Sequence, residues 1–258
     1  MPLFTFRSIR IYILLGFLLF SVIYTVHQLL YSRSWHNPLN VVIYPINADG
    51  KNTTARYVDT LSVDHFRGIE KWFAREGKRY KLLIERPIAI SLGSEIESLP
   101  PELPRYRNAV FNMMWGVHLR WWAFRHSPDD GSNLSRVRVF VLYHSAVDKP
   151  LPHSLGLQKG LIGLVNAFAV PRQNKQNNVV IAHEVLHTVG ALDKYAPGGY
   201  PIYPDGYANP NRKPLHPQRS AEIMAGRIPI GNGMLMMPRS LRSTVINEQT
   251  AREINWVK

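Results

Sequence analysis

Residues 177–193 read NNVVIAHEVLHTVGALD, and this stretch decides which fold and chemistry the sequence predicts. His183 and His187 are four positions apart, so on a helix their imidazoles share one face and can bind the same ion. Glu184 follows the first histidine, where its carboxylate can act as a general base on a water beside that ion. The spacing therefore predicts a zinc hydrolase site on a helix, with Glu184 as the catalytic residue.

The residues around this motif predict where the helix begins and ends. Asn177 and Asn178 are suitable N-caps, and an apolar run follows them. Gly190 is expected to end the helix, because glycine adopts the left-handed conformation at low cost. The chain can then turn back and bring Asp193 to the ion as a third ligand, which leaves a fourth position open for water. More distant alternatives for the third ligand are Glu222, Glu248, Glu253 and His216.

The segment from His183 to Asp193 resembles the active-site helix of the metzincin clan of zinc peptidases. Its form, H-E-x-x-H-x-x-G-x-x-D, is closest to that of the snapalysin-type enzymes. A second stretch, EIMAG at residues 222–226, resembles the Met-turn of the same clan. The resemblance covers residues 177–227. No tyrosine follows Met224, as it does in some members, and the nearby substitutes are Tyr195, Tyr200, Tyr203 and Tyr207.

This resemblance implies a metzincin-like α/β (α+β) domain, with a mixed twisted sheet, an active-site helix and a Met-turn. It implies Zn²⁺ as the cofactor, bound by His183, His187 and Asp193. Gly190 and Met224 would support the site structurally, Gly190 as the turn and Met224 as a packed floor beneath the histidines. His144 and His153 are expected to be surface histidines rather than ligands.

An apolar segment near the N-terminus predicts attachment to a membrane. Residues 11–31 (IYILLGFLLFSVIYTVHQLLY) carry no formal charge and are long enough to cross a hydrocarbon core of about 30 Å. Arg7 and Arg10 precede them, so the N-terminus is expected in the cytoplasm and the rest of the chain outside. A cleaved signal peptide is the alternative. The predicted division is a cytoplasmic N-terminus (1–10), a signal anchor (11–31), a linker (32–39) and an extracytoplasmic zinc peptidase domain (40–258).

Composition limits the partners of the 258-residue chain. It contains no cysteine, so a metal site cannot use thiolates and the domain cannot rely on disulfides. The net charge of +13 predicts attraction to anionic lipids or acidic envelope polymers, although a solvated basic surface without a partner is an equal alternative. We expect no nucleic-acid partner, because the charge lies on the wrong side of the membrane and no binding motif accompanies it.

Hydrophobic periodicity predicts an alternation of strands and helices. The expected strands are 40–46, 87–92, 136–143 and 161–170, and the expected helices are 60–76, 106–126, the metal helix and 247–256. Gly77 should end the first of these helices, and Asn247 should cap the last. We expect Trp115, Trp121 and Trp122 to be core residues rather than membrane contacts. The order suits a sandwich with its site in a cleft beside an edge strand, and the loop 197–217 could line that cleft or bind calcium.

The sequence thus predicts a membrane-anchored zinc endopeptidase that acts on a protein or peptide substrate. Two other classes stay open. One is a metal-binding envelope protein without catalysis, against which the presence of Glu184 argues. The other is a zinc amidase that acts on cell-wall material, with which a basic domain is compatible.

Overall fold

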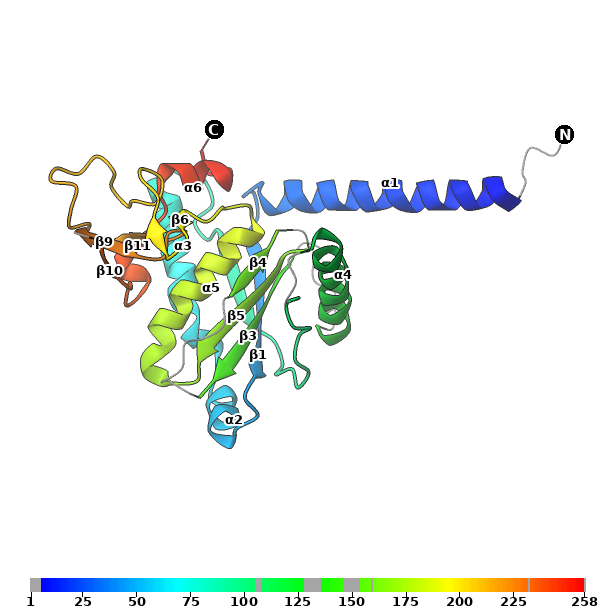
Figure 1. Ribbon diagram of the computed structural model, residues 1–258, viewed down its shortest axis with the longest axis horizontal. Coiled ribbons are helices and arrows are strands. Elements are labelled where there is room, and N and C mark those ends of the chain that lie inside the picture. The colour runs from blue at the N-terminus through cyan, green and yellow to red at the C-terminus, as the bar shows by residue number, and fades with distance from the viewer. Residues whose placement is uncertain are drawn as a thin grey trace.

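A five-stranded mixed sheet forms the centre of the domain in the computed structural model (Figure 1), which describes residues 6–104, 108–127, 136–145, 154–158, 160–231 and 233–257. Its strands are β1 (Leu39–Asn47), β2 (Ile88–Leu92), β3 (Val137–His144), β4 (Leu155–Leu157) and β5 (Ile162–Phe168). They lie in the order β2-β1-β3-β5-β4, and only β4, at one edge, is antiparallel to its neighbour. The predicted α/β class is confirmed.

Helices cover both faces of this sheet (Figure 1). The helices are α1 (Phe6–Ser32), α2 (Asn52–Asp59), α3 (Arg67–Arg79), α4 (Ala109–His126), α5 (Asn174–Thr188) and α6 (Glu248–Glu253), with short 3-10 turns η1 (Val63–His65), η2 (Pro171–Gln173) and η3 (Leu241–Ser243). Helices α3 and α5 pack in the larger core on one face, and α4 packs in a smaller core on the other.

The parallel strands are apolar on both sides because each side meets a helix layer. Val41 and Ile43 of β1 belong to the larger core, whereas Val42, Tyr44 and Ile46 belong to the smaller one. This alternation follows from the two-residue period of a strand. It explains why the four predicted strands, which correspond to β1, β2, β3 and β5, are confirmed within a few residues. Strand β4 has only three residues and gives no such pattern, so the sequence-based assignment lacks it.

The C-terminal third of the chain forms short two-stranded ladders around the end of α5. They are β6 (Tyr195–Ala196) with β7 (Tyr200–Pro201), β8 (Ala221–Glu222) with β11 (Thr244–Val245), and β9 (Ile228–Gly231) with β10 (Met234–Met236). Fully buried Glu76 ties α3 to this part: it pairs with Arg75 and Arg79 and accepts a hydrogen bond from the Ile246 amide at 3.1 Å.

Several helix boundaries differ from the prediction. The helix expected at 60–76 is instead η1 followed by α3, and the separate helix α2 before them was not predicted. Gly77 lies inside α3, which continues to Arg79. The lack of a side chain at Gly77 allows close packing, because a Cβ there would press on the side chains of Leu82 and Pro87. Asn247 caps α6 as predicted, through a bond from the Thr250 amide, although α6 ends at Glu253. His153 lies outside the described residues.

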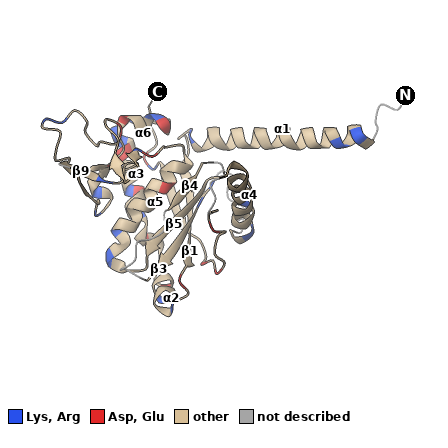
Figure 2. Cartoon of the chain, viewed as in Figure 1, with Lys and Arg blue, Asp and Glu red and all other residues tan. Residues whose placement is uncertain are grey.

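Helix α1 extends away from the domain (Figure 1) and is long and apolar enough to cross a membrane, with a mean hydropathy of 2.1. Its 27 residues span roughly 40 Å. Its charged residues, Arg7 and Arg10, lie near its N-terminal end, and Figure 2 shows the rest of the helix without charge. The chain that follows α1 is docked on the domain: the Trp35 indole donates to the Ile254 carbonyl at 2.6 Å and packs edge-on against Trp256.

Candidate metal centre

Helix α5 is buried between residues 181 and 188 except at His183 and His187, which are partly exposed. Ile181, Val185 and Leu186 are fully buried in the larger core, which fixes the rotation of the helix about its axis. With that rotation fixed, the two histidines point away from the core on the same face, and their rings meet edge-on with centroids 4.7 Å apart. The predicted helical presentation of the two histidines is confirmed.

The start of α5 corrects the capping prediction. The helix begins at Asn174, after η2, so Asn177 and Asn178 lie within it and are buried. Their side chains make tertiary hydrogen bonds instead: Asn177 donates to the Phe168 carbonyl at 3.0 Å, and Asn178 donates to the His65 carbonyl at 2.8 Å. Asparagine favours caps because its side chain bonds backbone groups, and here those groups belong to neighbouring elements.

The end of α5 confirms the predicted turn. Gly190 has a φ of +105°, its amide donates to the His187 carbonyl at 3.1 Å, and the Ala191 amide donates to the Leu186 carbonyl at 3.0 Å. These paired bonds form a Schellman motif, which reverses the chain just after a helix. The reversal carries Asp193 back toward the two histidines.

The side chains of His183, His187 and Asp193 converge at this turn. Asp193 Oδ1 lies 3.2 Å from His183 Nε2 and 3.1 Å from His187 Nε2, and the two Nε2 atoms are 3.1 Å apart. Among the described residues these three form a group that could hold a metal ion. Tetrahedral Zn²⁺ with ligand bonds of about 2.0–2.1 Å places its ligand atoms roughly 3.3 Å apart, so the spacing fits that ion.

Hydrogen bonds on the far side of each imidazole aim the ligand atoms. His183 Nδ1 lies 2.9 Å from the Ile223 carbonyl, and His187 Nδ1 lies 2.8 Å from the Ala191 carbonyl. A carbonyl only accepts, so each Nδ1 carries a proton and each Nε2 is left with its lone pair toward the cluster. Two lone pairs and a carboxylate this close together require a positive charge between them, from a proton or from a metal ion.

The segment 222–226 forms a tight turn against this cluster. The amides of Ala225 and Gly226 both donate to the Glu222 carbonyl at 3.1 Å, and Gly226 has a φ of +68°. Met224 is fully buried, and its carbonyl accepts from the Lys194 amide at 3.1 Å. Through Ile223 and Met224 the turn contacts both the first histidine and the residue after Asp193.

Glu184 is buried beside the histidines, and its Oε2 has no hydrogen-bond partner among the described residues. Burial raises the pKa of Glu184, while His183 and His187 oppose that shift. The edge strand β4 closes over it: a Cβ at Gly156 would come within 2.6 Å of the Glu184 carbonyl oxygen and 3.1 Å of Oε2. The sequence alone does not single out Gly156, because the close approach depends on a strand that the pattern misses.

The ionisable ligands shift one another. Burial by itself would lower the pKa of His183, but its hydrogen bond with Asp193 and the charge of Glu184 raise that pKa to about 9. Burial would raise the pKa of Asp193, yet the two histidines hold it well below its usual range. Both shifts express the same fact: the geometry stabilises a cation next to the Asp193 carboxylate.

No family model matches the sequence. No curated protein shows significant similarity to it either.

The alternative ligands have other partners. Glu222 accepts from the Thr250 hydroxyl at 2.7 Å and the Ala225 amide at 3.0 Å, and Glu253 pairs with buried Lys194 at 2.7 Å. Glu248 pairs with Arg252, and the His216 ring packs near Tyr207. Of the four candidate tyrosines, Tyr195 approaches the cluster: burial and the charge of the Asp193 carboxylate raise its pKa to about 12.

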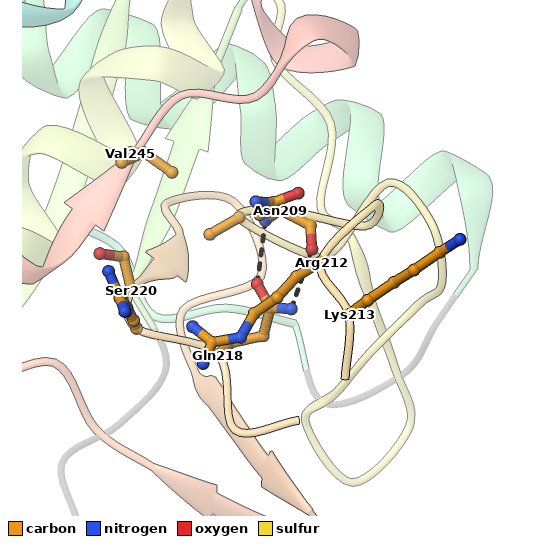
Figure 3. A pocket seen from close by; sticks show the side chains of 8 residues that line it. Asn209, Arg212, Lys213, Gln218, Ser220 and Val245 are labelled. Atoms are coloured by element: carbon orange, nitrogen blue, oxygen red, sulfur yellow. Dashed lines mark hydrogen bonds between the residues drawn. The ribbon is translucent and has the colours of Figure 1, made fainter. Parts of the chain in front are cut away.

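The later part of the loop 197–217, from residue 208 to 213, lines a separate hollow of about 430 Å³ together with residues 218–220 and Val245 (Figure 3). Gln218 braces it by bonding both backbone groups of Asn209, and Arg212 and Lys213 add positive charge. The residues that line it include no carboxylate, so this hollow lacks the charged oxygen ligands that calcium prefers, and calcium binding elsewhere in the loop stays a prediction. They also include no member of the His183, His187 and Asp193 cluster.

Proposed function

We propose that this protein is a membrane-anchored zinc endopeptidase. The observation that carries the proposal is the joint arrangement of His183, His187 and Asp193 within ligand-atom distances of 3.1–3.2 Å, with the unpaired Glu184 carboxylate buried beside them. Two imidazoles and one carboxylate leave one coordination position open, which is typical of catalytic rather than structural zinc sites. When bound, Zn²⁺ would supply Lewis-acid chemistry, polarising a carbonyl and acidifying water.

The protein side chains then have distinct tasks. Asp193 supplies a charged ligand, and the Ile223 and Ala191 carbonyls hold the histidines in the ligand tautomer. Glu184 accepts a proton from the attacking water and returns it to the leaving amine, as a general base and then a general acid. A carboxylate without a competing hydrogen bond is available for that exchange, whereas a merely structural carboxylate would be satisfied by neighbours.

The edge strand β4 supports a peptide as substrate. Among the described residues β4 pairs only with β5, and it lies against α5 at the metal cluster. The free edge of a strand offers a row of amides and carbonyls to which an extended peptide can add as a further strand. A peptide bound in this way would cross the histidine face of α5. This favours a protein or peptide substrate over cell-wall material.

We also propose that the domain is metzincin-like. Support comes from the histidine helix that ends in a Schellman turn at Gly190, from the buried Met224 in a tight turn against His183, and from a mixed sheet with an antiparallel edge strand. The anchor would be α1, with Arg7 and Arg10 in the cytoplasm and residues 40–258 on the periplasmic or extracellular side.

The decisive experiment compares three variants of the full-length protein in detergent. Glu184→Gln should keep stoichiometric zinc and lose turnover of a casein substrate, whereas His187→Ala should lose both. Asp193→Ala should lower zinc occupancy. Retention of full peptidase activity in Glu184→Gln would overturn the proposed mechanism, and unchanged zinc in Asp193→Ala would move the third ligand elsewhere. Wild-type protein with chelator gives the background rate.

A further inference from the structure

Helix α4 has a second apolar face that no described element covers. Its inner face, with Leu119, Trp122 and Ala123, packs in the smaller core. Its outer face is formed by Val110, Met113, Met114, Val117, Trp121 and Phe124, which are all strongly exposed, Phe124 at 73%. These residues recur every three or four positions, so they form one continuous stripe along the helix. The prediction that all three tryptophans are core residues is therefore wrong for Trp121.

An exposed apolar stripe of this length requires an explanation. Isolated exposed apolar side chains are ordinary in soluble proteins, but a contiguous patch marks a surface that meets a protein or a membrane. The 18 residues of α4 include no aspartate or glutamate, and its last turn carries Arg125 and His126. A helix with apolar and aromatic residues toward one side and only basic charges matches an interfacial helix on an anionic bilayer.

The position of α4 in the fold points to the same occupant. Helix α4 forms the flank of the domain toward which α1 extends, it runs across the direction of α1, and it lies level with the domain-proximal part of α1 (Figure 1). The anchor cannot swing freely, because Gln28 and Ser32 at its end are buried and Trp35 is bonded to Ile254. A bilayer that contains α1 would therefore meet α4 at its surface.

We infer that α4 is a second membrane contact, which lies in the headgroup region of the bilayer that α1 crosses and binds it through the outer apolar face. Trp121 and Phe124 enter the boundary between headgroups and acyl chains, and Arg125 meets lipid phosphates. The inference rests on the proposed membrane insertion of α1. With two contacts the domain cannot rotate about the anchor, so the bilayer fixes its orientation.

The absence of cysteine from the chain allows a direct test with single introduced cysteines. Met113→Cys and Phe124→Cys place an environment-sensitive fluorophore on the outer face of α4. Met234→Cys in the β9–β10 hairpin is the matched control, because Met234 is exposed at 57% and Met113 at 65% and the hairpin lies at the far end of the domain (Figure 1). Leu19→Cys reports on α1. Each full-length variant is reconstituted into vesicles of equal parts phosphatidylcholine and phosphatidylglycerol, with or without quencher lipids. These carry a nitroxide near the headgroup for the labels at positions 113, 124 and 234, and on the acyl chain for the label at position 19, which α1 would place near the bilayer centre.

The expected result is a blue-shifted emission at positions 113 and 124 that loses most of its intensity with the quencher lipid, while position 234 is unaffected. Quenching at 113 and 124 by aqueous iodide, with no response to the quencher lipid, would overturn the inference. So would a label that is protected from both quenchers in a manner that depends on protein concentration, since a second copy would then cover α4. A quenched label at Leu19 with unquenched labels on α4 refutes the α4 contact alone, whereas an unquenched label at Leu19 refutes the anchor as well.

Discussion

A single methyl group at Gly190 tests the geometry of the candidate metal centre directly. The φ of +105° lies in a region that L side chains avoid, and a Cβ there would also overlap the guanidinium of Arg33. The backbone conformation alone costs alanine about 1–2 kcal/mol. The overlap should add little, because the end of the arginine side chain can move aside. We therefore expect Gly190→Ala to lower the free energy of unfolding by about 1–2 kcal/mol.

The same change should weaken metal binding, because this turn aims Asp193 at the histidines. The assay is urea unfolding of the full-length protein in detergent, followed by tryptophan fluorescence, together with a zinc titration. Gly50→Ala is the matched control: Gly50 has a φ of +65°, and no atom lies near its Cβ position. It should lose comparable stability and keep its zinc affinity.

The double variant Arg33→Ala/Gly190→Ala separates the two contributions. If the dihedral angle dominates, the loss caused by the alanine at position 190 persists when Arg33 is absent. Full recovery of stability would place the cost in the side-chain overlap instead. Equal stability of Gly190→Ala and the wild-type protein would refute the argument that this turn requires glycine.

Three further outcomes follow from the structure. Glu76→Ala should lower the free energy of unfolding by about 1–3 kcal/mol, because it leaves the Ile246 amide without an acceptor; urea unfolding checks this, and a loss no larger than that of exposed Glu97→Ala would contradict it. Burial raises the pKa of Glu222 to about 7 from an ordinary value of 4.5, so the folded state holds its proton more tightly than the unfolded state. Stability from this group is complete below about pH 4.5, falls as the pH rises to about 7 and is constant above, and Glu222→Gln should flatten that decline in thermal midpoints measured across this range. Finally, chelator should lower the thermal midpoint of the wild-type protein, since saturation at 100 times the dissociation constant adds about 2.7 kcal/mol, and should leave His187→Ala unchanged; an equal drop in both would show that the chelator acts elsewhere.

The parts of the site that depend on local geometry could be predicted from the sequence. The four-residue spacing of His183 and His187 places both side chains on one helix face. Gly190 predicts a turn from its own backbone preference, without reference to distant residues. Asp193 follows within reach of that turn, so the three side chains that the structure brings together were all available from one segment. The same reasoning succeeds at Asn247, which bonds the third amide of its own helix.

The parts that depend on distant partners could not be predicted. Asn177 and Asn178 have the character of caps, but their partners are carbonyls of Phe168 and His65, and nothing local shows that. Strand β4 is too short to show a periodic pattern in the sequence. The packing of Gly156 against Glu184 depends on this strand, so it could not be predicted either. In α4, the apolar residues on both faces gave no amphipathic pattern, and only the packing separates buried Trp122 from exposed Trp121.

The docking of Trp35 on Ile254 and Trp256 has a consequence for where cleavage would occur. Because few residues separate the end of α1 from the first fixed contact, the distance from a bilayer that contains α1 to the candidate metal centre would be a constant of the fold. If the chain is the peptidase proposed above, a substrate held in the same bilayer would be cut at a set number of residues from its own membrane-spanning segment. A polypeptide free in solution would have no such register, and its cleavage positions would follow side-chain preference alone.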